Sequence, residues 1–300
     1  MRRIGIDLGG TKIEALVLDA EGREVFRKRV PAPHGAYEAT LAAVVALVRE
    51  AGEGTVGIGI PGALSPVTGL VKNANSTHLI GHAFKQDLER ALGREVRMAN
   101  DANCFALSEA VDGAAAGAEV VFGVILGTGV GGGVVVRGQV LTGVNAIAGE
   151  WGHNPLPLPT AQDLPLRACY CRRLGCIEAY LSGPSFARDH EQASGERLTP
   201  EEIVARGNEA TLARYEERLA RALGSVINVI DPDVVVLGGG MSNVQRLYEH
   251  VPRLWGRYIF SDHVATRLVR AMHGDASGVR GAAWLWGGQP RGPSERAAIA

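Results

Sequence analysis

The chain has 300 residues, 46% of them hydrophobic and 21% charged, which is enough for one large or two medium domains with a sizeable core. Its formal net charge of −1 gives no basic footprint, so no nucleic-acid partner is expected. The sequence contains no run of about 18 apolar residues, so no membrane-spanning helix is expected.

At the start of the chain, Arg2 and Arg3 stand beside a short apolar run that Asp7 interrupts. A secretory signal needs an uninterrupted apolar region of about 7 to 15 residues, so none is predicted here. We therefore expect a cytoplasmic protein, in which reduced cysteines suit metal binding better than disulfides.

Short apolar runs that lead into glycines alternate with helical patterns along the chain. The runs lie at residues 4–6, 56–60, 120–126 and 234–237. Helices are predicted at 38–51, which stops at Gly52, and over 212–230, which ends at Asp231 and a following proline. Strands that alternate with helices predict an α/β fold.

Two of the strand–glycine units resemble each other. One strand leads into Asp7-Leu8-Gly9-Gly10-Thr11-Lys12 and a second strand, and another leads into Gly127-Thr128-Gly129 and a second strand. Each pattern predicts a hairpin, and a phosphate can lie between two such hairpins on backbone N–H groups. A tight turn is the simpler explanation for any single glycine cluster, but several clusters at strand ends favour ligand binding. We expect a duplicated architecture with a cleft between the halves.

Asp101 stands where a strand-like segment, 95–99, gives way to a helical one. Two interpretations remain open. The carboxylate can cap the helix by satisfying its orphan amides. Alternatively, it can serve as a general base that takes the proton from a hydroxyl group as that group attacks a phosphate.

Three of the four cysteines lie within residues 169–176, and His153 precedes them. This is a metal-ligand pattern, typical of a structural ion, and the carboxylates Glu150 and Glu178 frame it. The alternative is that the cysteines are small buried hydrophobic residues, which is what we expect of Cys104.

The complete set of motifs resembles the ROK family of bacterial sugar kinases, part of the sugar-kinase, actin and heat-shock ATPase superfamily. The motifs are Asp7–Lys12, Asn100-Asp101, G-T-G-x-G at 127–131, A-G-E-x-G-H at 148–153, and C-x-C-x₄-C-x-E at 169–178. The resemblance runs from residue 1 to about residue 286. It implies an α/β, two-domain, actin/hexokinase-like (ribonuclease H-like) ATPase fold with a central nucleotide and sugar cleft.

We expect a domain boundary near residues 113–117, a small and featureless stretch. The small N-terminal domain would comprise 1–115 and a C-terminal helix at about 280–290. The large domain, with the zinc site, would comprise 116–279. Residues 287–300 are rich in Gly, Pro, Arg and Ser and are expected to form a flexible tail.

The resemblance implies a role for each matching residue. The ATP phosphates would be flanked by Gly9, Gly10, Thr11, Lys12, Gly127, Thr128, Gly129 and Gly131. Asp7 would lie near Mg²⁺, and the adenosine would face Gly238, Gly239 and Gly240. Asp101 would be the general base, and the sugar would be bound by Gly62, Asn75, Asn100, Asp101, Glu150, His153 and Glu178.

A structural zinc ion would be held by His153, Cys169, Cys171 and Cys176. One ring nitrogen of His153 would bind the zinc, and the other would face a sugar hydroxyl. The family usually has glycine directly after the second cysteine, where this chain has Arg172, and the bulkier residue is expected to alter the turn around the metal.

The segments 61–62, 72–77 and 150–157 look most like the family's fructokinases. The resemblance therefore predicts ATP-dependent phosphorylation of a hexose at the 6-hydroxyl, with fructose as substrate and mannose or glucose as weaker substrates. Residues 100–109 resemble N-acetylglucosamine kinase almost equally well, and that activity is the alternative.

Another class of function is a non-catalytic, sugar-sensing regulator. The presence of Asp101 argues against a sensor that has lost its base. The first strand begins too close to Met1 for the helix-turn-helix that repressors of the family carry. The resemblance also suggests a homodimer.

Overall fold

The computed structural model of the chain describes residues 1–33, 35–74 and 76–287. The chain divides into two compact units. Unit 1 comprises Met1–Gly117, Gly133–Ala148 and the segment that begins at Met272, and unit 2 comprises Ala118–Gly132 and Gly149–Ala271. Compact units need not coincide with domains, so the domain ranges given above stay predictions.

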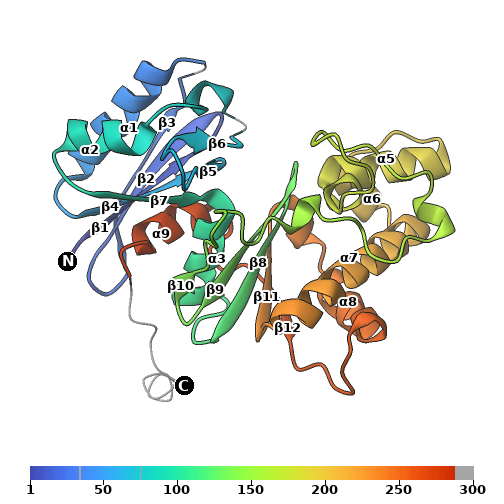
Figure 1. Cartoon of the computed structure of the whole chain (residues 1–300). Helices are drawn as coiled ribbons and strands as arrows, with labels where there is room; N and C mark the ends of the chain where they lie inside the picture. The colour runs from blue at the N-terminus through green and yellow to red at the C-terminus, as the bar shows by residue number, and fades with distance from the viewer. Residues whose placement is uncertain (34, 75, 288–300) are drawn as a thin grey trace. The chain divides into compact units, whose positions relative to one another are not determined.

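The helices and strands follow one another in the alternation that the apolar runs predict (Figure 1). The strands are β1 (Arg3–Leu8), β2 (Lys12–Leu18), β3 (Glu24–Pro31), β4 (Thr55–Ile60), β5 (Ala63–Leu64), β6 (Val71–Lys72), β7 (Val96–Asn100), β8 (Val120–Leu126), β9 (Val130–Val136), β10 (Gln139–Val140), β11 (Val234–Gly238) and β12 (Arg267–Arg270). The helices are α1 (Tyr37–Ala51), α2 (Phe84–Leu92), α3 (Asp101–Val111), α4 (Glu178–Leu181), α5 (Gly183–Ser194), α6 (Pro200–Ala205), α7 (Glu209–Ile230), α8 (Leu247–Trp255) and α9 (Ser277–Trp284).

Both predicted helices are confirmed, and the local chemistry explains their ends. Helix α1 stops at Gly52, whose φ of +89° breaks the helical conformation. Helix α7 begins after Asn208, whose side chain accepts a hydrogen bond from the Thr211 N–H at 3.1 Å, and it ends at Asp231 in the left-handed region. Helix ends that carry such capping or glycine residues can therefore be predicted from the sequence.

The sheet of unit 1 has the strand order β3-β2-β1-β4-β7. Alternate residues of its strands pack into a core with α1, as Ile4 and Ile6 do. The residues between them are glycines where α9 lies against the sheet. A methyl group added at Gly5 would lie 2.1 Å from the Val279 carbonyl oxygen, and one at Gly57 would lie 1.8 Å from that of Ala282. The glycines therefore let the α9 backbone contact the strands directly.

Helix α9 also packs on α3, and it lies earlier in the chain than predicted. A methyl group at Gly281 would lie 1.6 Å from the carbonyl oxygen of Cys104, whose side chain is fully buried, as expected of a small hydrophobic residue. The helix predicted at 280–290 is corrected to Ser277–Trp284. Beyond its last residue the chain continues through Leu285, whose N–H donates to the Ala282 carbonyl oxygen, to Gly287, where φ is +87°. The rest of the predicted tail, 288–300, lies outside the described residues.

The second five-stranded sheet has the order β10-β9-β8-β11-β12, with β8, β11 and β12 parallel. The first sheet has the same plan, since β1, β4 and β7 are parallel and the hairpin strands lie on the other side of β1. The shared strand order agrees with the duplicated architecture expected from the sequence. Among the described residues, no helix has the length and apolar character needed to cross a membrane.

Candidate functional site

In unit 1, the first glycine turn closes a regular antiparallel hairpin. Strands β1 and β2 pair from Arg3↔Leu18 to Leu8↔Ile13, and the Gly9 N–H donates to the Lys12 carbonyl oxygen at 3.0 Å. No described atom lies within 4 Å of the point where a Cβ would stand on Gly10. The turn therefore leaves its backbone accessible, as a phosphate-binding hairpin requires.

Asp7 lies just before this turn, opposite Glu14 in the β1–β2 register. Burial and then the negative charges of Asp101 and Glu14 raise the pKa of Asp7 to about 6, although Lys12 and Arg29 oppose the shift. The fold thus brings Asp7 and Asp101 close enough for their charges to interact. Two carboxylates that repel each other in a partly buried place suit a bound cation.

The start of α3 shows which residue occupies the capping position of the helix. The helix cap is Asn100, whose side-chain oxygen accepts from the Ala102 N–H at 2.8 Å. Asp101 is the first residue of the helix, and its Oδ1 accepts from the same N–H at 2.7 Å. Asn100 therefore occupies the capping position, one residue earlier than predicted, and Asp101 shares the Ala102 N–H with it.

Asn100 also forms a hydrogen bond with another predicted sugar-binding residue of unit 1. Its Nδ2 donates to the Gly62 carbonyl oxygen at 3.1 Å. Gly62 has a φ of +92°, and a methyl group on it would lie 2.5 Å from the Lys72 carbonyl oxygen, so only glycine fits. Asn75, the remaining predicted residue of this group, lies outside the described residues.

In unit 2, the second glycine turn is fixed from both sides. The Gly127 N–H donates to the Gly129 carbonyl oxygen at 3.0 Å, and the Gly183 N–H at the start of α5 donates to the Gly127 carbonyl oxygen at 2.8 Å. Gly239, which follows β11 with a φ of +79°, leaves no room for a side chain, because a methyl group there would lie 2.5 Å from the Leu126 carbonyl oxygen. Gly238 is the last residue of β11, and Gly131 accepts from the Trp151 indole N–H at 2.9 Å.

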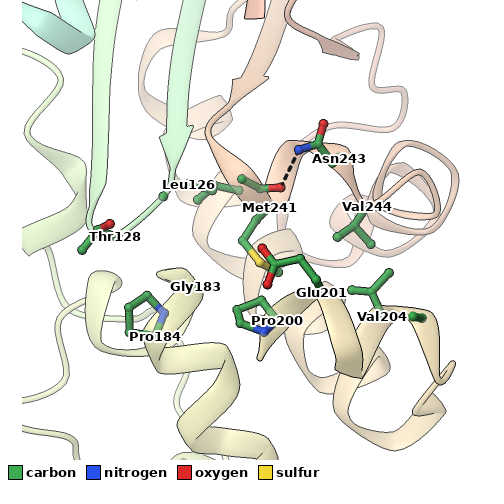
Figure 2. A pocket seen from close by; sticks show the side chains of 13 residues that line it. Leu126, Thr128, Gly183, Pro184, Pro200, Glu201, Val204, Met241, Asn243 and Val244 are labelled. Atoms are coloured by element: carbon green, nitrogen blue, oxygen red, sulfur yellow. Dashed lines mark hydrogen bonds between the residues drawn. The ribbon is translucent and has the colours of Figure 1, made fainter. Parts of the chain in front are cut away.

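A cavity of about 580 Å³ opens beside this turn, within the size range of small-molecule pockets. Figure 2 shows Thr128, Pro200 and Met241 around it. It is lined by Leu126, Gly127, Thr128, Gly183, Pro184, Pro200, Glu201, Val204, Ala205, Gly240, Met241, Asn243 and Val244. Gly127, Thr128 and Gly240 belong to the predicted nucleotide set.

The wall of this cavity that α5 and α6 supply was not predicted from the sequence. No motif marks it. The signal available in the sequence was a proline in the first turn of each helix, because proline there predicts a helix start. Pro184 follows the capping residue Ser182 by two positions, and Pro200 directly follows the capping residue Thr199.

The three cysteines and His153 form one compact cluster in unit 2. The three Sγ atoms and a ring nitrogen of His153 all lie within 4.8 Å of one another. Cys171 and Cys176 are 3.5 Å apart at Sγ, and Cys169 Sγ lies 3.6 Å from His153 Nδ1. In tetrahedral zinc sites, bond lengths of about 2.0–2.3 Å place neighbouring ligands roughly 3.3–3.8 Å apart. The residues therefore fit a closed structural zinc site.

The turn between the second and third cysteines keeps a conformation that favours glycine. Arg172 has a φ of +70°, its N–H donates to the Cys169 carbonyl oxygen at 3.0 Å, and the Cys169 N–H donates to that of Arg173 at 2.9 Å. The glycine usual in the family thus has a physical reason. Arg172 adopts this turn in a region of φ that disfavours side chains, and an effect of the residue on metal binding stays a prediction.

The second ring nitrogen of His153 has a protein partner that the sequence analysis did not identify. Its Nε2 lies 3.0 Å from the hydroxyl oxygen of Tyr170, and the two rings meet edge to face. Partial desolvation and then the nearby charges of Glu178, Cys169 and Glu150 raise the pKa of Tyr170 to about 12. Tyr170 therefore lies among the residues of unit 2 that were predicted to bind sugar.

Glu178 connects the cysteine cluster with the glycine turn. Its Oε2 accepts from the Val130 N–H at 2.8 Å, and its Oε1 lies 3.9 Å from Cys169 Sγ. A methyl group on Gly129 would lie 2.7 Å from Oε2. Glu150 is exposed beside the cluster.

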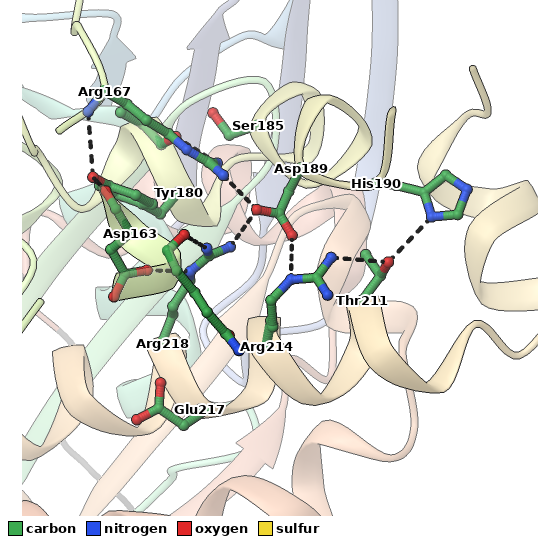
Figure 3. Close-up of polar contacts among 12 residues, drawn as sticks. Asp163, Arg167, Tyr180, Ser185, Asp189, His190, Thr211, Arg214, Glu217 and Arg218 are labelled. Atoms are coloured by element: carbon green, nitrogen blue, oxygen red, sulfur yellow. Dashed lines mark hydrogen bonds and ion pairs between the residues drawn. The ribbon is translucent and has the colours of Figure 1, made fainter. Parts of the chain in front are cut away.

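A second charged cluster in unit 2 consists of ion pairs between its own aspartates and arginines. Figure 3 shows Asp189 of α5 facing Arg167, Arg214 and Arg218, and all three are ion-paired with it. Asp163 pairs with Arg218 at 2.7 Å and with Arg221 at 2.9 Å. These contacts hold the loop before the cysteines to α5 and α7, which makes this cluster structural.

The two mixed sheets, the glycine turns and the cavity together define an α/β nucleotide-binding protein. The ROK family model matches residues 3–289. An N-acetyl-D-glucosamine kinase from Salmonella typhimurium is 44% identical over 296 residues, covering 94% of this chain and 98% of that protein.

Two solved structures are also similar. The ROK hexokinase from Thermus thermophilus has a TM-score of 0.82 at 33% identity, covering 95% of this chain and 97% of that one. A ROK family glucokinase from Streptomyces griseus, in complex with glucose and AMPPNP, has a TM-score of 0.74 at 28% identity, covering 95% of this chain and 99% of that one. The predicted actin/hexokinase-like α/β fold class is confirmed.

This chain belongs to the ROK family, and its similarity lies with the sugar kinases of that family.

Proposed function

We propose that this ROK-family sugar kinase transfers the γ-phosphoryl group of ATP to the 6-hydroxyl of N-acetylglucosamine. The observation that carries the proposal is the 44% identity, over 94% of the chain, with an N-acetyl-D-glucosamine kinase. Fructose, the substrate expected from short segments, has no support among the relatives described above. The alternative expected from residues 100–109 takes its place.

The nucleotide is assigned to unit 2. Its adenosine occupies the 580 Å³ cavity, whose apolar residues Pro200, Val204 and Val244 suit a flat aromatic base. In unit 2 its phosphates lie on the backbone N–H groups of the Gly127–Gly131 turn, and in unit 1 the Gly9–Lys12 turn is proposed as a second phosphate-binding turn. Asp7 would hold Mg²⁺, which would supply positive charge against the phosphates.

Asp101 is the general base of the proposed reaction. It takes the proton of the sugar 6-hydroxyl as that oxygen attacks the γ-phosphorus. Two observations support this role: Asn100 supplies the helix cap, and the repulsion between Asp101 and Asp7 disfavours a merely structural function. Asn100, Gly62 and Asn75 bind the sugar from unit 1, and Glu150, His153 and Glu178 bind it from unit 2.

A coupled assay of ADP release tests the proposed function. The kcat/KM for N-acetylglucosamine should exceed the values for fructose, mannose and glucose. A higher value for fructose would restore the substrate expected from the sequence. No turnover of any of the four sugars would remove the kinase assignment.

Zinc is proposed to bind the cluster of three cysteines and His153 as a structural ion. Metal analysis should find about one zinc per chain. Cys171→Ser should lose the metal and lower the midpoint of thermal unfolding. Cys104→Ala, a change of the cysteine outside the cluster, should keep the metal. A fully stable, zinc-free protein would contradict the proposal. The expected homodimer stays a prediction, which light scattering tests.

A further inference from the structure

The cavity of unit 2 has polar side chains in its lining, and they differ in what they can offer a ligand. They are Thr128, Glu201 and Asn243. Thr128 belongs to the glycine turn. Asn243 is engaged at both ends of its amide, because its Nδ2 donates to the Gly240 carbonyl oxygen at 3.1 Å and its Oδ1 accepts from Arg270. Among the described residues that line the cavity, Glu201 is the one with a charge.

The start of α6 explains why Glu201, rather than its neighbour, faces the cavity. Thr199 Oγ1 accepts from the Glu202 N–H at 3.2 Å, and Glu202 Oε2 accepts from the Thr199 N–H at 2.8 Å. This capping box commits the Glu202 carboxylate to the helix start. Figure 2 shows the Glu201 side chain directed from α6 towards Met241, which also lines the cavity. The two adjacent glutamates therefore have different surroundings.

The position of Glu201 along the cavity follows from the contacts of α6. The Gly183 N–H donates to the Gly127 carbonyl oxygen at 2.8 Å, and a methyl group on Gly183 would lie 3.8 Å from Pro200 Cγ. The first residue of α6 is therefore close to the glycine turn. Val204 follows Pro200 by about one helical turn, roughly 6 Å along the axis. Glu201 thus belongs to the end of α6 near the turn, and Val204 to the far end.

This order matches the order of the parts of a nucleotide. The ribose joins the phosphates to the base, so it lies beside Glu201 when the phosphates lie on the Gly127–Gly131 turn and the base lies against Val204. The 2′- and 3′-hydroxyls of ribose can donate hydrogen bonds, and the two oxygens of an ionised carboxylate only accept them. Hydrogen bonds to a charged acceptor are stronger than those to a neutral one.

We propose that Glu201 is a specificity-determining residue that selects ribonucleotides, because its carboxylate accepts hydrogen bonds from the 2′- and 3′-hydroxyls of the nucleotide ribose. The inference rests on the proposed function, which assigns the adenosine to this cavity, and it adds one contact to that assignment. A 2′-deoxynucleotide leaves one carboxylate oxygen without its donor and should therefore bind more weakly.

Glu201→Ala tests this contact by removing both acceptor oxygens. Calorimetric titration of the full chain with ADP and with 2′-deoxy-ADP measures it. The unmodified protein should bind ADP about tenfold more tightly than 2′-deoxy-ADP. In Glu201→Ala, ADP should bind at least about tenfold more weakly, and the two ligands should differ by less than about twofold. In kinetic assays the KM for ATP should rise, while kcat should change less than about twofold, since Glu201 does not contact the reacting atoms.

Glu201→Gln and Glu202→Gln form a matched pair, because they make the same change at adjacent positions of α6. Glutamine at 201 keeps the length and a neutral acceptor, so ADP should bind about threefold more weakly. Glutamine at 202 still accepts from the Thr199 N–H and preserves the capping box. It should leave the affinities for ADP and 2′-deoxy-ADP unchanged.

Four results would overturn the inference. Equal affinities of the unmodified protein for ADP and 2′-deoxy-ADP would mean that no group reads the 2′-hydroxyl. Equal losses for both ligands in Glu201→Ala would mean that Glu201 does not contact it. Tighter binding of ADP by Glu201→Ala would mean that the carboxylate repels the phosphates. Loss of discrimination between ADP and inosine diphosphate alone would mean that Glu201 reads the amino group of adenine. Failure of the proposed function is a separate outcome, seen when the unmodified protein binds neither nucleotide.

Discussion

In unit 1, burial and the charges of Asp101 and Glu14 raise the pKa of Asp7 to about 6. In unit 2, burial also opposes ionisation of Asp163, but hydrogen bonds from Thr160, Arg218 and Arg221 outweigh it and lower the pKa to about 2. The two aspartates have the same chemistry and opposite environments. A carboxylate held against like charges indicates a place prepared for a ligand, whereas one surrounded by arginines stabilises the fold.

The contrast extends to the neighbours of each aspartate. Asp163 and Asp189 together contact four arginines, all from segments distant in the sequence. Asp7 has Lys12 and Arg29 as opposing charges, yet their effect does not offset burial and repulsion. Substitutions of aspartate by asparagine should therefore separate catalysis from stability in the two units.

Asp101→Asn should have the largest effect, on activity alone. Loss of the general base should lower kcat about a thousandfold, while the free energy of unfolding changes by less than about 0.5 kcal/mol. Asparagine can still accept from the Ala102 N–H, so the helix start is preserved. Steady-state kinetics and urea denaturation measure the two quantities. Undiminished turnover would show that Asp101 is not the base.

Asp163→Asn should have the opposite effect: it should lower the free energy of unfolding and preserve activity. Two buried arginines lose one of their charged partners, although Arg218 keeps Asp189 and Arg221 keeps Glu217, and the change should cost about 3 kcal/mol of unfolding free energy at pH 7. Glu53→Gln, in an exposed pair whose atoms are 3.7 Å apart, is the control and should cost little. Equal stability of the two variants would remove the structural role of this cluster.

The stability lost in Asp163→Asn should also depend on pH. The folded-state pKa of Asp163 lies below its model value of 3.8, so the ionised form stabilises the fold above about pH 4. About 2 kcal/mol of the difference between the two proteins should disappear as the pH falls from 4 towards 2. Denaturation curves at several pH values measure it, and a difference that grows on acidification would have the wrong sign.

Asp7→Asn should stabilise the protein when Mg²⁺ and nucleotide are absent. Its folded-state pKa is raised from 3.8 to about 6, so ionisation destabilises the fold as the pH rises through this range. The variant should gain about 1–3 kcal/mol at pH 8, nothing at pH 3.5, and lose activity. A loss of stability at pH 8 would mean that the carboxylate is well paired.

Arg172→Gly should have the smallest effect, a gain of about 0.5–1 kcal/mol, because glycine adopts a φ of +70° without strain. Tighter zinc binding should accompany it, measured by chelator competition. Arg173→Gly, next to it without a positive φ, is the control and should give no gain.

Much of the architecture was predictable because its signals are local. The strand at residues 4–6, the helix that stops at Gly52 and the hairpin at Gly9–Lys12 follow from periodicity and from residues with special backbone freedom. The grouping of Cys169, Cys171 and Cys176 is also a matter of short spacing.

Other parts of the candidate site were not predictable in this way. The wall of the cavity at Pro200 and Val204 depends on α6 packing beside a glycine turn far away in the sequence. The partner of Glu178 is a backbone amide at Val130, and that of His153 Nε2 is Tyr170. The partner of a side chain depends on which helices and strands pack together, and no short sequence pattern predicts that packing.

The sequence by itself therefore determined which residues have the chemistry of a sugar kinase: the glycine turns, the acidic residues at strand ends and the cysteines with their histidine. Only the tertiary structure decided how each carboxylate behaves. Asp7 lies near Asp101 and resists ionisation, while Asp163 lies near Arg218 and Arg221 and remains ionised. The reason is that charge and burial act through space, across elements that the chain brings together only when it folds.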